Sequence, residues 1–545
     1  MKKALSLLMV FVLLASSSAY FFAFAAEPGY VDIPIIHIYG NGNDIYSEDE
    51  SKVVFPVTYN TKQLPSAIAR VLFPYFTNAV LFGKWDEYYD AFYNEVDAIY
   101  NESHLDENGN ATNGTDIKQS YYTQNKTKMG IDYLKRSGKY GLHSYSFWYD
   151  WRLDPMENAD KLDEYIRGIM KTTGRSQISL AARCLGSVVV FAYLEKYGTD
   201  HIKAVAFDSM VGNGNETISD LFTGKIKLDG KALERYQAQV NNGWGNEPGE
   251  SEGYFLAEFV DATLGLANEA GLIETGSKLF DKIYKKLYDG LVPRIVMASF
   301  GTWPGYWAVV KAEDYQTARE LVFGVEEYRT KYAGLIEKLD NYDEKVRQRI
   351  PEILTAAKEN DTNIGIISKY GYQAKPWVEN GVKLGDGLAS LDRASLGATC
   401  SIIGETLSDE YIAQRVAEGN EKYISADKQV DASTCLFPDY TWIVKNIHHN
   451  TFELDDVLYS ILTYDGQFDV YTKSDYPQFM VYDYKTNSFA PLTEENCDVS
   501  PWGDTNMGDS NIKTGFSAIV KFFKALNDYI IVKLKIWFND TFKAK

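Results

Sequence analysis

The sequence predicts an α/β fold with a mostly parallel central sheet and a helical insertion. Short apolar runs typical of strands alternate with helical segments between residues 141 and 207, and the links between them are short. A charged helical pattern with interleaved aromatic residues follows over residues 228–360, and a strand pattern returns at residues 363–370. Strands and helices that alternate with short links favour a parallel sheet.

The expected elements follow from periodicity and from capping signals. Asp154-Pro155 provides an aspartate cap and a proline at the first helical position, so a helix is expected from there to about Thr173. The run from Asp32 to Tyr39 is rich in isoleucine and ends at Gly40-Asn41-Gly42, which predicts a buried strand followed by a glycine loop. Further strands are expected at residues 141–148, 177–181, 202–207, 363–370 and 440–444, and further helices at 65–100, 129–137, 187–194 and 454–462.

The length of 545 residues exceeds what one compact core usually holds, so large insertions or a second domain are expected. We predict an α/β core over residues 26–227 and 361–475. Residues 228–360 are expected to form a cap or lid over the sheet, and an independent helical domain is the alternative. Residues 476–512 are expected to form an irregular or β-rich surface segment.

The N-terminus has the pattern of a secretory signal peptide over residues 1–25. Met1-Lys2-Lys3 precedes an apolar run, and Ala23-Phe24-Ala25 provides a cleavage site before Ala26. Ser17-Ser18-Ala19 is a second choice of site, and an uncleaved anchor is the alternative to cleavage. Either alternative predicts a secreted protein or one associated with the extracytoplasmic surface.

The C-terminal residues 513–545 predict a basic amphipathic helix on an otherwise acidic chain. Apolar side chains recur with helical spacing from Phe516 to Leu526, and lysines punctuate the segment. Such a helix is typical of contact with a membrane surface, here through residues 516–542. Docking on the core of the protein is the alternative. The formal net charge of −20 and the absence of a basic arm argue against nucleic acid as a partner.

Four cysteines are present in the whole sequence, at positions 184, 400, 435 and 497. In an oxidising compartment, one disulfide is expected if Cys184 is a nucleophile, and Cys400–Cys435 is the pair we predict. The spacing of cysteines and histidines shows no zinc signature, so no metal site is expected.

The pentapeptide Ala182-Arg183-Cys184-Leu185-Gly186 lies between an expected strand and an expected helix. A small residue, a nucleophile and a glycine at alternate positions of such a turn form the nucleophile elbow of α/β-hydrolases, here with cysteine in place of serine. The N-terminus of the following helix and the neighbouring Arg183 both favour a thiolate. A buried structural cysteine in a strand–helix unit is the alternative.

A nucleophile needs a base and an orienting acid, which follow it in the order acid then histidine in this fold. His449 is the preferred base and His448 the second choice, because both follow the expected strand at 440–444 and precede the helix at 454–462. His201 begins the strand after the elbow helix, so it is expected at the wrong end of the sheet. Asp386, in a Gly-Asp-Gly turn, is the expected acid. Ordinary turn or surface roles are the alternatives for all of these residues.

The oxyanion hole normally combines the amide after the nucleophile with an amide from the loop after an early strand. Leu185 and Asn41 occupy these positions in the sequence.

Tyr149-Asp150-Trp151-Arg152 precedes the elbow and resembles a motif of the lecithin:cholesterol acyltransferase family, which includes lysosomal phospholipase A2. Patches of residues 30–465 are similar to that family's oxyanion strand and loop, to its strand after the elbow, and to its acid strand and loop. The resemblance implies an α/β-hydrolase with a helical cap, no metal or organic cofactor, and a structural role for the four-residue motif. It assigns the nucleophile to Cys184, the acid to Asp386, the base to His449 and the oxyanion amides to Asn41 and Leu185. The family has serine at position 184 and usually histidine at 183.

The sequence therefore predicts an acyl-ester hydrolase or O-acyltransferase, of the lipase or phospholipase type, that acts on lipid esters through an acyl-cysteine. A catalytically decayed hydrolase that binds lipid or serves as a surface protein is the main alternative. A cysteine peptidase is disfavoured, because no papain-like active-site string is present near the predicted mature N-terminus.

Overall fold

The computed structural model describes residues 30–40, 43–56, 74–76, 78–79, 82–124, 144–225, 290–373, 382–449, 454–483, 486 and 488–497. Several predictions concern residues outside these ranges. They are the signal peptide at 1–25, the oxyanion candidate Asn41, the helix at 129–137, the first part of the 228–360 insertion and the amphipathic helix at 513–545.

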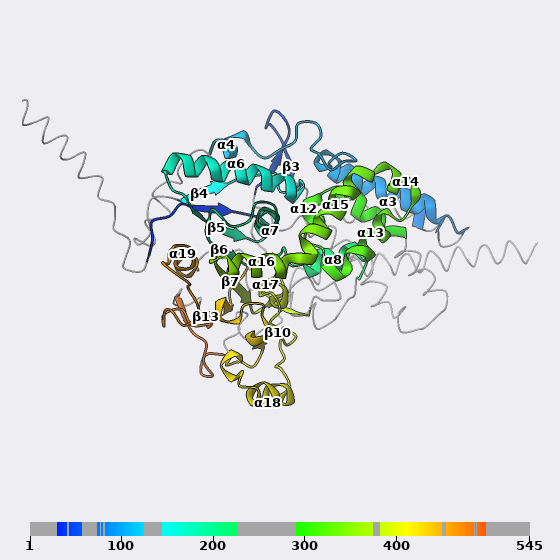
Figure 1. Cartoon of the computed structure of the whole chain (residues 1–545). Helices are drawn as coiled ribbons and strands as arrows, with labels where there is room; N and C mark the ends of the chain where they lie inside the picture. The colour runs from blue at the N-terminus through cyan, green and yellow to red at the C-terminus, as the bar shows by residue number, and fades with distance from the viewer. Residues whose placement is uncertain are drawn as a thin grey trace, which may run out of the picture.

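The described strands build a mixed α/β fold around an eight-stranded, mostly parallel sheet (Figure 1). The strand order is β14-β13-β12-β7-β6-β5-β1-β4. β13 and β14 pair antiparallel, and the other neighbouring pairs of this sheet are parallel. The strands are β1 (Ile35–Ile38), β4 (Ser144–Phe147), β5 (Ile178–Arg183), β6 (Ile202–Asp208), β7 (Asn363–Tyr370), β12 (Thr441–Lys445), β13 (Phe479–Asp483) and β14 (Ser488–Pro491).

Short two-stranded sheets lie outside this central sheet. They pair β2 (Ile45–Tyr46) with β3 (Val53–Phe55), β8 (Tyr372–Gln373) with β9 (Leu384–Gly385), and β10 (Thr399–Cys400) with β11 (Val430–Asp431). The named helices are α3 (Trp85–Tyr100), α4 (Gln119–Gln124), α6 (Pro155–Thr173), α7 (Gly186–Tyr197), α8 (Glu216–Phe222), α12 (Pro304–Trp307), α13 (Tyr315–Phe323), α14 (Glu326–Lys331), α15 (Ala333–Lys345), α16 (Ile350–Glu359), α17 (Leu391–Ala394), α18 (Asp409–Ala417) and α19 (Asp455–Thr463).

The central strands are buried on both faces, because alternate side chains enter two separate apolar cores. Val205 and Phe207 of β6 belong to the larger core, which also contains side chains of α6 and α7. Ala204 and Ala206 of the same strand belong to a second core, which contains side chains of α19. Helices therefore cover both faces of the sheet (Figure 1).

α6 begins where the sequence predicts it. Oδ1 of Asp154 accepts a hydrogen bond from the amide of Met156 at 2.9 Å, and Pro155 is the first helical residue. The helix ends at Gly174, whose φ of 71° is one that glycine adopts without strain.

The described part of the 228–360 insertion is helical. It begins with a helix at 290–299, continues through α12, α13, α14 and α15, and ends with α16. α16 contacts α7 and β7, so this last helix packs directly on the sheet layers.

The Tyr-Asp-Trp-Arg motif anchors the insertion to the sheet. The amide of Gly305 donates to the carbonyl oxygen of Arg152 at 3.0 Å, and a Cβ on Gly305 would lie 2.0 Å from the carbonyl oxygen of Trp151. The buried guanidinium of Arg152 donates to the carbonyl oxygens of Ser103 (2.8 Å) and Thr115 (3.1 Å) and pairs with the carboxylate of Asp150 (2.7 Å).

The predicted Cys400–Cys435 disulfide is wrong, because all four cysteines are free thiols. The Sγ of Cys400 donates to the carbonyl oxygen of Ala398 at 3.4 Å. Burial raises the pKa of Cys400 well above its usual value and that of Cys435 to about 12, so both thiols stay protonated. Within the described ranges, no helix has the length and apolar character needed to cross a membrane.

Candidate active site

The site lies at the carboxyl ends of the parallel strands, where the strand order changes direction. β4, which follows β1 in the sheet, pairs with one edge of β1, and β5 pairs with the opposite edge. Open α/β sheets bind ligands outside the strand ends at such a switch point. The residues that leave β1 and β5 at this point are Tyr39-Gly40 and Cys184.

Cys184 occupies a tight turn between β5 and α7. Its φ of 50° is unusual for a residue with a side chain, so the backbone holds strain at this position. The amide of Cys184 donates to the carbonyl oxygen of Asp208 at 3.2 Å, and its own carbonyl oxygen accepts from Oγ of Ser187 at 2.7 Å. A Cβ on Gly186 would lie 2.3 Å from the carbonyl oxygen of Ile38, which is the physical reason for glycine in the pentapeptide.

His449 and Asp386 lie together at two points. Nδ1 of His449 is 2.8 Å from Oδ2 of Asp386, and the amide of His449 donates to the carbonyl oxygen of Asp386 at 3.0 Å. The other carboxylate oxygen accepts from the amides of Leu388 (3.0 Å) and Ala389 (2.7 Å). Burial opposes the charge, but His449 and these amides hold the pKa of Asp386 below its usual range.

Cys184 completes the group through His449. Burial opposes the imidazolium, but the charges of Asp386 and Cys184 and the hydrogen bond to Asp386 raise the pKa of His449 well above its ordinary value. Because Nδ1 contacts Asp386, the interaction with Cys184 falls to Nε2. Nε2 is buried and forms no hydrogen bond with the described residues. In catalytic sites such hydrogen bonds are often long without a ligand, so this geometry does not exclude Nε2 as a proton acceptor.

The other two histidine candidates lie elsewhere. His448 packs edge-on against Tyr372, with ring centroids 5.4 Å apart. His201 is exposed one residue before β6, at the end of this strand opposite Asp208.

The space in front of the Leu185 amide is bounded by Gly40. A Cβ on Gly40 would lie 3.0 Å from the Leu185 amide nitrogen and 3.1 Å from Sγ of Cys184. The hydroxyl of Tyr149 donates to the carbonyl oxygen of Tyr39 at 2.9 Å, which anchors this loop. Burial and the charge of Cys184 raise the pKa of Tyr149, so the phenol stays protonated beside the thiol.

Arg183, which was expected to favour a thiolate at Cys184, forms two ion pairs in the structure. Its guanidinium is buried and pairs with Asp208 at 3.2 Å and with Asp455 at 2.5 Å. Two carboxylates therefore balance its positive charge. The reason is the strand alternation, which turns this side chain of β5 toward the start of α19.

Asp208 and Lys369 are two buried charged residues that the sequence analysis did not single out. Nζ of Lys369 lies 2.8 Å from Oδ1 of Asp208 and donates to the carbonyl oxygen of His449 at 3.5 Å. Burial disfavours the carboxylate, but Lys369 and Arg183 keep the pKa of Asp208 low. A charged residue at the end of an apolar strand is the signal that could have indicated both, since such residues are rarely buried without a partner.

Comparisons with known proteins identify no family. No family model matches the chain, and no curated protein matches it. A chain from a solved structure described as "The crystal structure of Tle4-Tli4 complex" shares 12% identity with a TM-score of 0.24. The match covers 63% of this chain and 76% of that chain. The strand order and helices of the structure therefore define the class of protein, which is a mixed α/β fold with a large, mostly parallel sheet.

Proposed function

We propose that the chain is a secreted or surface-associated α/β-hydrolase that cleaves or transfers acyl groups of lipid esters through an acyl-cysteine. The observation that carries the proposal is that Asp386 binds His449 and that Cys184 acts on the same imidazole, with Cys184 following β5 and His449 following β12 of the parallel sheet. Their order along the chain and the positive φ of Cys184 are those of a nucleophile elbow and its partners. The Tyr149–Arg152 motif supports a relationship to the lecithin:cholesterol acyltransferase family.

In the acylation step, Nε2 of His449 takes the proton of Cys184. The thiolate sulfur attacks the ester carbonyl carbon, and the π electron pair moves to the carbonyl oxygen beside the Leu185 amide. Collapse of this intermediate breaks the C–O bond of the ester. The leaving alkoxide takes the proton from His449, which releases an alcohol and leaves a thioester on Cys184.

In the deacylation step, His449 removes a proton from water or from an acceptor alcohol. The oxygen attacks the thioester carbonyl, the C–S bond breaks, and the thiolate is restored beside an imidazolium. Water gives a carboxylic acid and an alcohol gives a new ester. Asp386 stays ionised throughout and stabilises the imidazolium.

Aromatic side chains next to the site support an apolar acyl group. Tyr39, which precedes Gly40, stacks on Trp148 with ring centroids 5.1 Å apart. The ring centroids of Tyr121 and Trp148 are 5.2 Å apart. Large aromatic surfaces of this kind bind apolar ligands well.

The test is acylation of Cys184 by a p-nitrophenyl ester and by phosphatidylcholine vesicles, followed by intact mass and peptide mapping. We expect an acyl adduct on Cys184 and release of the alcohol, both lost in Cys184→Ala. Cys497→Ala, which removes a thiol that donates to the carbonyl oxygen of Glu494, is the matched control. Equal turnover by Cys184→Ala contradicts the proposed nucleophile. Vesicle binding by wild type without any adduct or turnover favours the lipid-binding alternative.

A further inference from the structure

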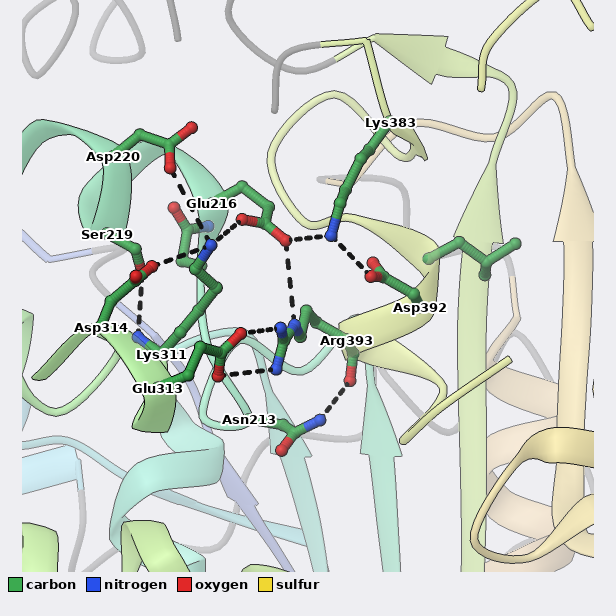
Figure 2. Close-up of polar contacts among 12 residues, drawn as sticks. Asn213, Glu216, Ser219, Asp220, Lys311, Glu313, Asp314, Lys383, Asp392 and Arg393 are labelled. Atoms are coloured by element: carbon green, nitrogen blue, oxygen red, sulfur yellow. Dashed lines mark hydrogen bonds and ion pairs between the residues drawn. The ribbon is translucent and has the colours of Figure 1, made fainter. Parts of the chain in front are cut away.

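A cluster of ion pairs around the buried Glu216 (Figure 2) includes residues of the loop that carries Asp386. Here the acid loop means residues 383–393. The cluster joins three segments that are distant in sequence: the start of α8, residues 311–314 and the acid loop.

Glu216, the first residue of α8, is at the centre of this cluster. Its side chain is 1% exposed. One carboxylate oxygen accepts from Nζ of Lys383 at 2.6 Å and lies 3.8 Å from Nε of Arg393. The other accepts from Nζ of Lys311 at 2.7 Å. A single buried carboxylate therefore contacts three cations.

Two of these cations lie at opposite ends of the acid loop. Lys383 precedes Asp386, and Arg393 follows it. Lys383 also pairs with Asp392 at 2.8 Å, so the same ammonium ties the two ends of the loop to each other. Glu216 thereby holds both ends of the loop against the start of α8, as Figure 2 shows.

Two asparagines just before Glu216 also bind the loop, one in its middle and one at its C-terminal end. Nδ2 of Asn215 donates to the carbonyl oxygen of Leu388 at 3.0 Å, and Nδ2 of Asn213 donates to the carbonyl oxygen of Arg393 at 3.2 Å. Leu388 is also a residue whose amide donates to the carboxylate of Asp386. Asn215 therefore binds a residue that itself binds the carboxylate of Asp386.

Residues 208–216, which we call the bridging segment, also contact the turn that carries Cys184. The carbonyl oxygen of Asp208 accepts from the amide of Cys184, and the amide of Val211 donates to the carbonyl oxygen of Cys184 at 3.4 Å. The amide of Gly212 donates to Oγ of Ser187 at 2.9 Å. One short stretch of chain therefore touches both the Cys184 turn and the acid loop.

We infer that Glu216 is a positioning residue, which fixes the acid loop relative to the Cys184 turn and so sets how Asp386 orients His449. This inference rests on the proposed function of the triad. Stability alone is a poor reason for such a cluster, because replacing buried ion pairs with apolar residues is often neutral or stabilising. A group held by several cations at both ends of a catalytic loop instead restricts that loop to one geometry.

The experiment compares Glu216→Gln with Asp314→Asn in the full-length chain. Both variants remove one buried carboxylate charge from the cluster, but Asp314 pairs with Lys225 and Lys311, outside the acid loop. The readouts are p-nitrophenyl acetate turnover, melting temperature, and the pH profile of iodoacetamide alkylation of Cys184 followed by peptide mass.

We expect Glu216→Gln to lower turnover about ten- to a hundredfold, the typical effect of a small displacement of a catalytic group. The charged groups that face His449 are Cys184, Asp386, Asp208 and Lys369. Displacement of Asp386 removes one support of the imidazolium, so the thiolate–imidazolium pair is less populated and the onset of alkylation moves to higher pH. Asp314→Asn keeps the wild-type profile even if its melting temperature falls.

A wild-type rate and pH profile in Glu216→Gln overturns the inference, as does an equal change in both variants. If Glu216→Gln does not fold, Asn215→Ser provides the second test. Serine retains the cap that Asn215 provides to the amide of Ile218 but lacks the amide donor to Leu388, and the same shift is expected. If wild type turns over no ester, the proposed function fails, while the alkylation profiles still test the positioning.

Discussion

The backbone amide and the imidazole ring of His449 both bind Asp386, the first through the carbonyl oxygen at 3.0 Å and the second through the carboxylate at 2.8 Å. The backbone hydrogen bond therefore fixes the loops that carry His449 and Asp386 to each other independently of side-chain conformation. The contact at Nδ1 places the proton there in the neutral ring and leaves Nε2 as the atom that accepts a proton. This paired contact distinguishes His449 from the adjacent His448.

The raised pKa of His449 predicts a stability that depends on pH. A group whose pKa is raised by folding contributes stability fully below its unfolded pKa of about 6.5, and this contribution is lost as the pH rises through the folded value. We expect the advantage of wild type over His449→Gln in free energy of unfolding to shrink as the pH rises above about 6.5. Urea denaturation from about pH 6 to about pH 9 measures this difference.

The exposed His201 provides the control for this experiment. The difference between wild type and His201→Gln is expected to stay nearly constant over the same pH range. An advantage over His449→Gln that grows with pH would contradict the raised pKa.

Gly40→Ala is expected to impair acyl transfer more than folding. The added methyl group would lie 3.0 Å from the Leu185 amide nitrogen and 3.1 Å from Sγ of Cys184, so it would enter the space assigned to the oxyanion. We expect ester turnover to fall roughly 10²- to 10³-fold, as when one oxyanion donor is lost. Steady-state kinetics and the melting temperature together separate this effect from unfolding.

Gly168→Ala is the matched control, because a Cβ at this exposed position of α6 meets no atom within 4 Å. It should leave turnover unchanged and stabilise the protein by roughly 0.5–1 kcal/mol, the usual gain from alanine in a helix interior. Equal turnover in both glycine variants would place the oxyanion elsewhere.

Arg152→Lys should destabilise the fold although it retains the charge. A lysine lacks the fork that reaches Ser103, Thr115 and Asp150 together, so buried acceptors lose their donors. We expect a loss of about 3–5 kcal/mol in the free energy of unfolding, the usual cost of breaking a buried charged contact. Urea denaturation measures the loss. Lys52→Ala removes an exposed ion pair with Glu102 and should change the free energy of unfolding little. A similar loss in the Arg152 and Lys52 variants would contradict the anchoring role.

Local signals in the sequence were sufficient for much of the sheet. The strand predicted at 363–370 is β7, the one at 202–207 is β6, and the capped helix from Asp154 is α6. Apolar periodicity and capping act over a few residues, so a single sequence contains them. Two strands of the sheet, β13 and β14, come instead from the segment expected to be irregular or β-rich surface, because their place beside β12 is set by tertiary contact.

The charged partners of the site could not be predicted in the same way. Arg183 was expected to act on the thiol, but Asp208 and Asp455 bind it in the structure. Glu216 and Lys383 have no local signal that pairs them, since the pairing arises only when the acid loop meets the start of α8. Contacts of this kind depend on the tertiary arrangement rather than on spacing along the chain.

The position of the helical insertion has a consequence for the order of folding. β6 and β7 are neighbours in the sheet, yet the whole insertion separates Asp208 from Asn363 along the chain. During synthesis the Cys184 turn emerges long before its acid and its base, and pairing of β6 with β7 must await the intervening helices. Under the proposed mechanism, a nascent chain therefore carries a thiol without its base, and reactivity arises only when the C-terminal part of the sheet forms.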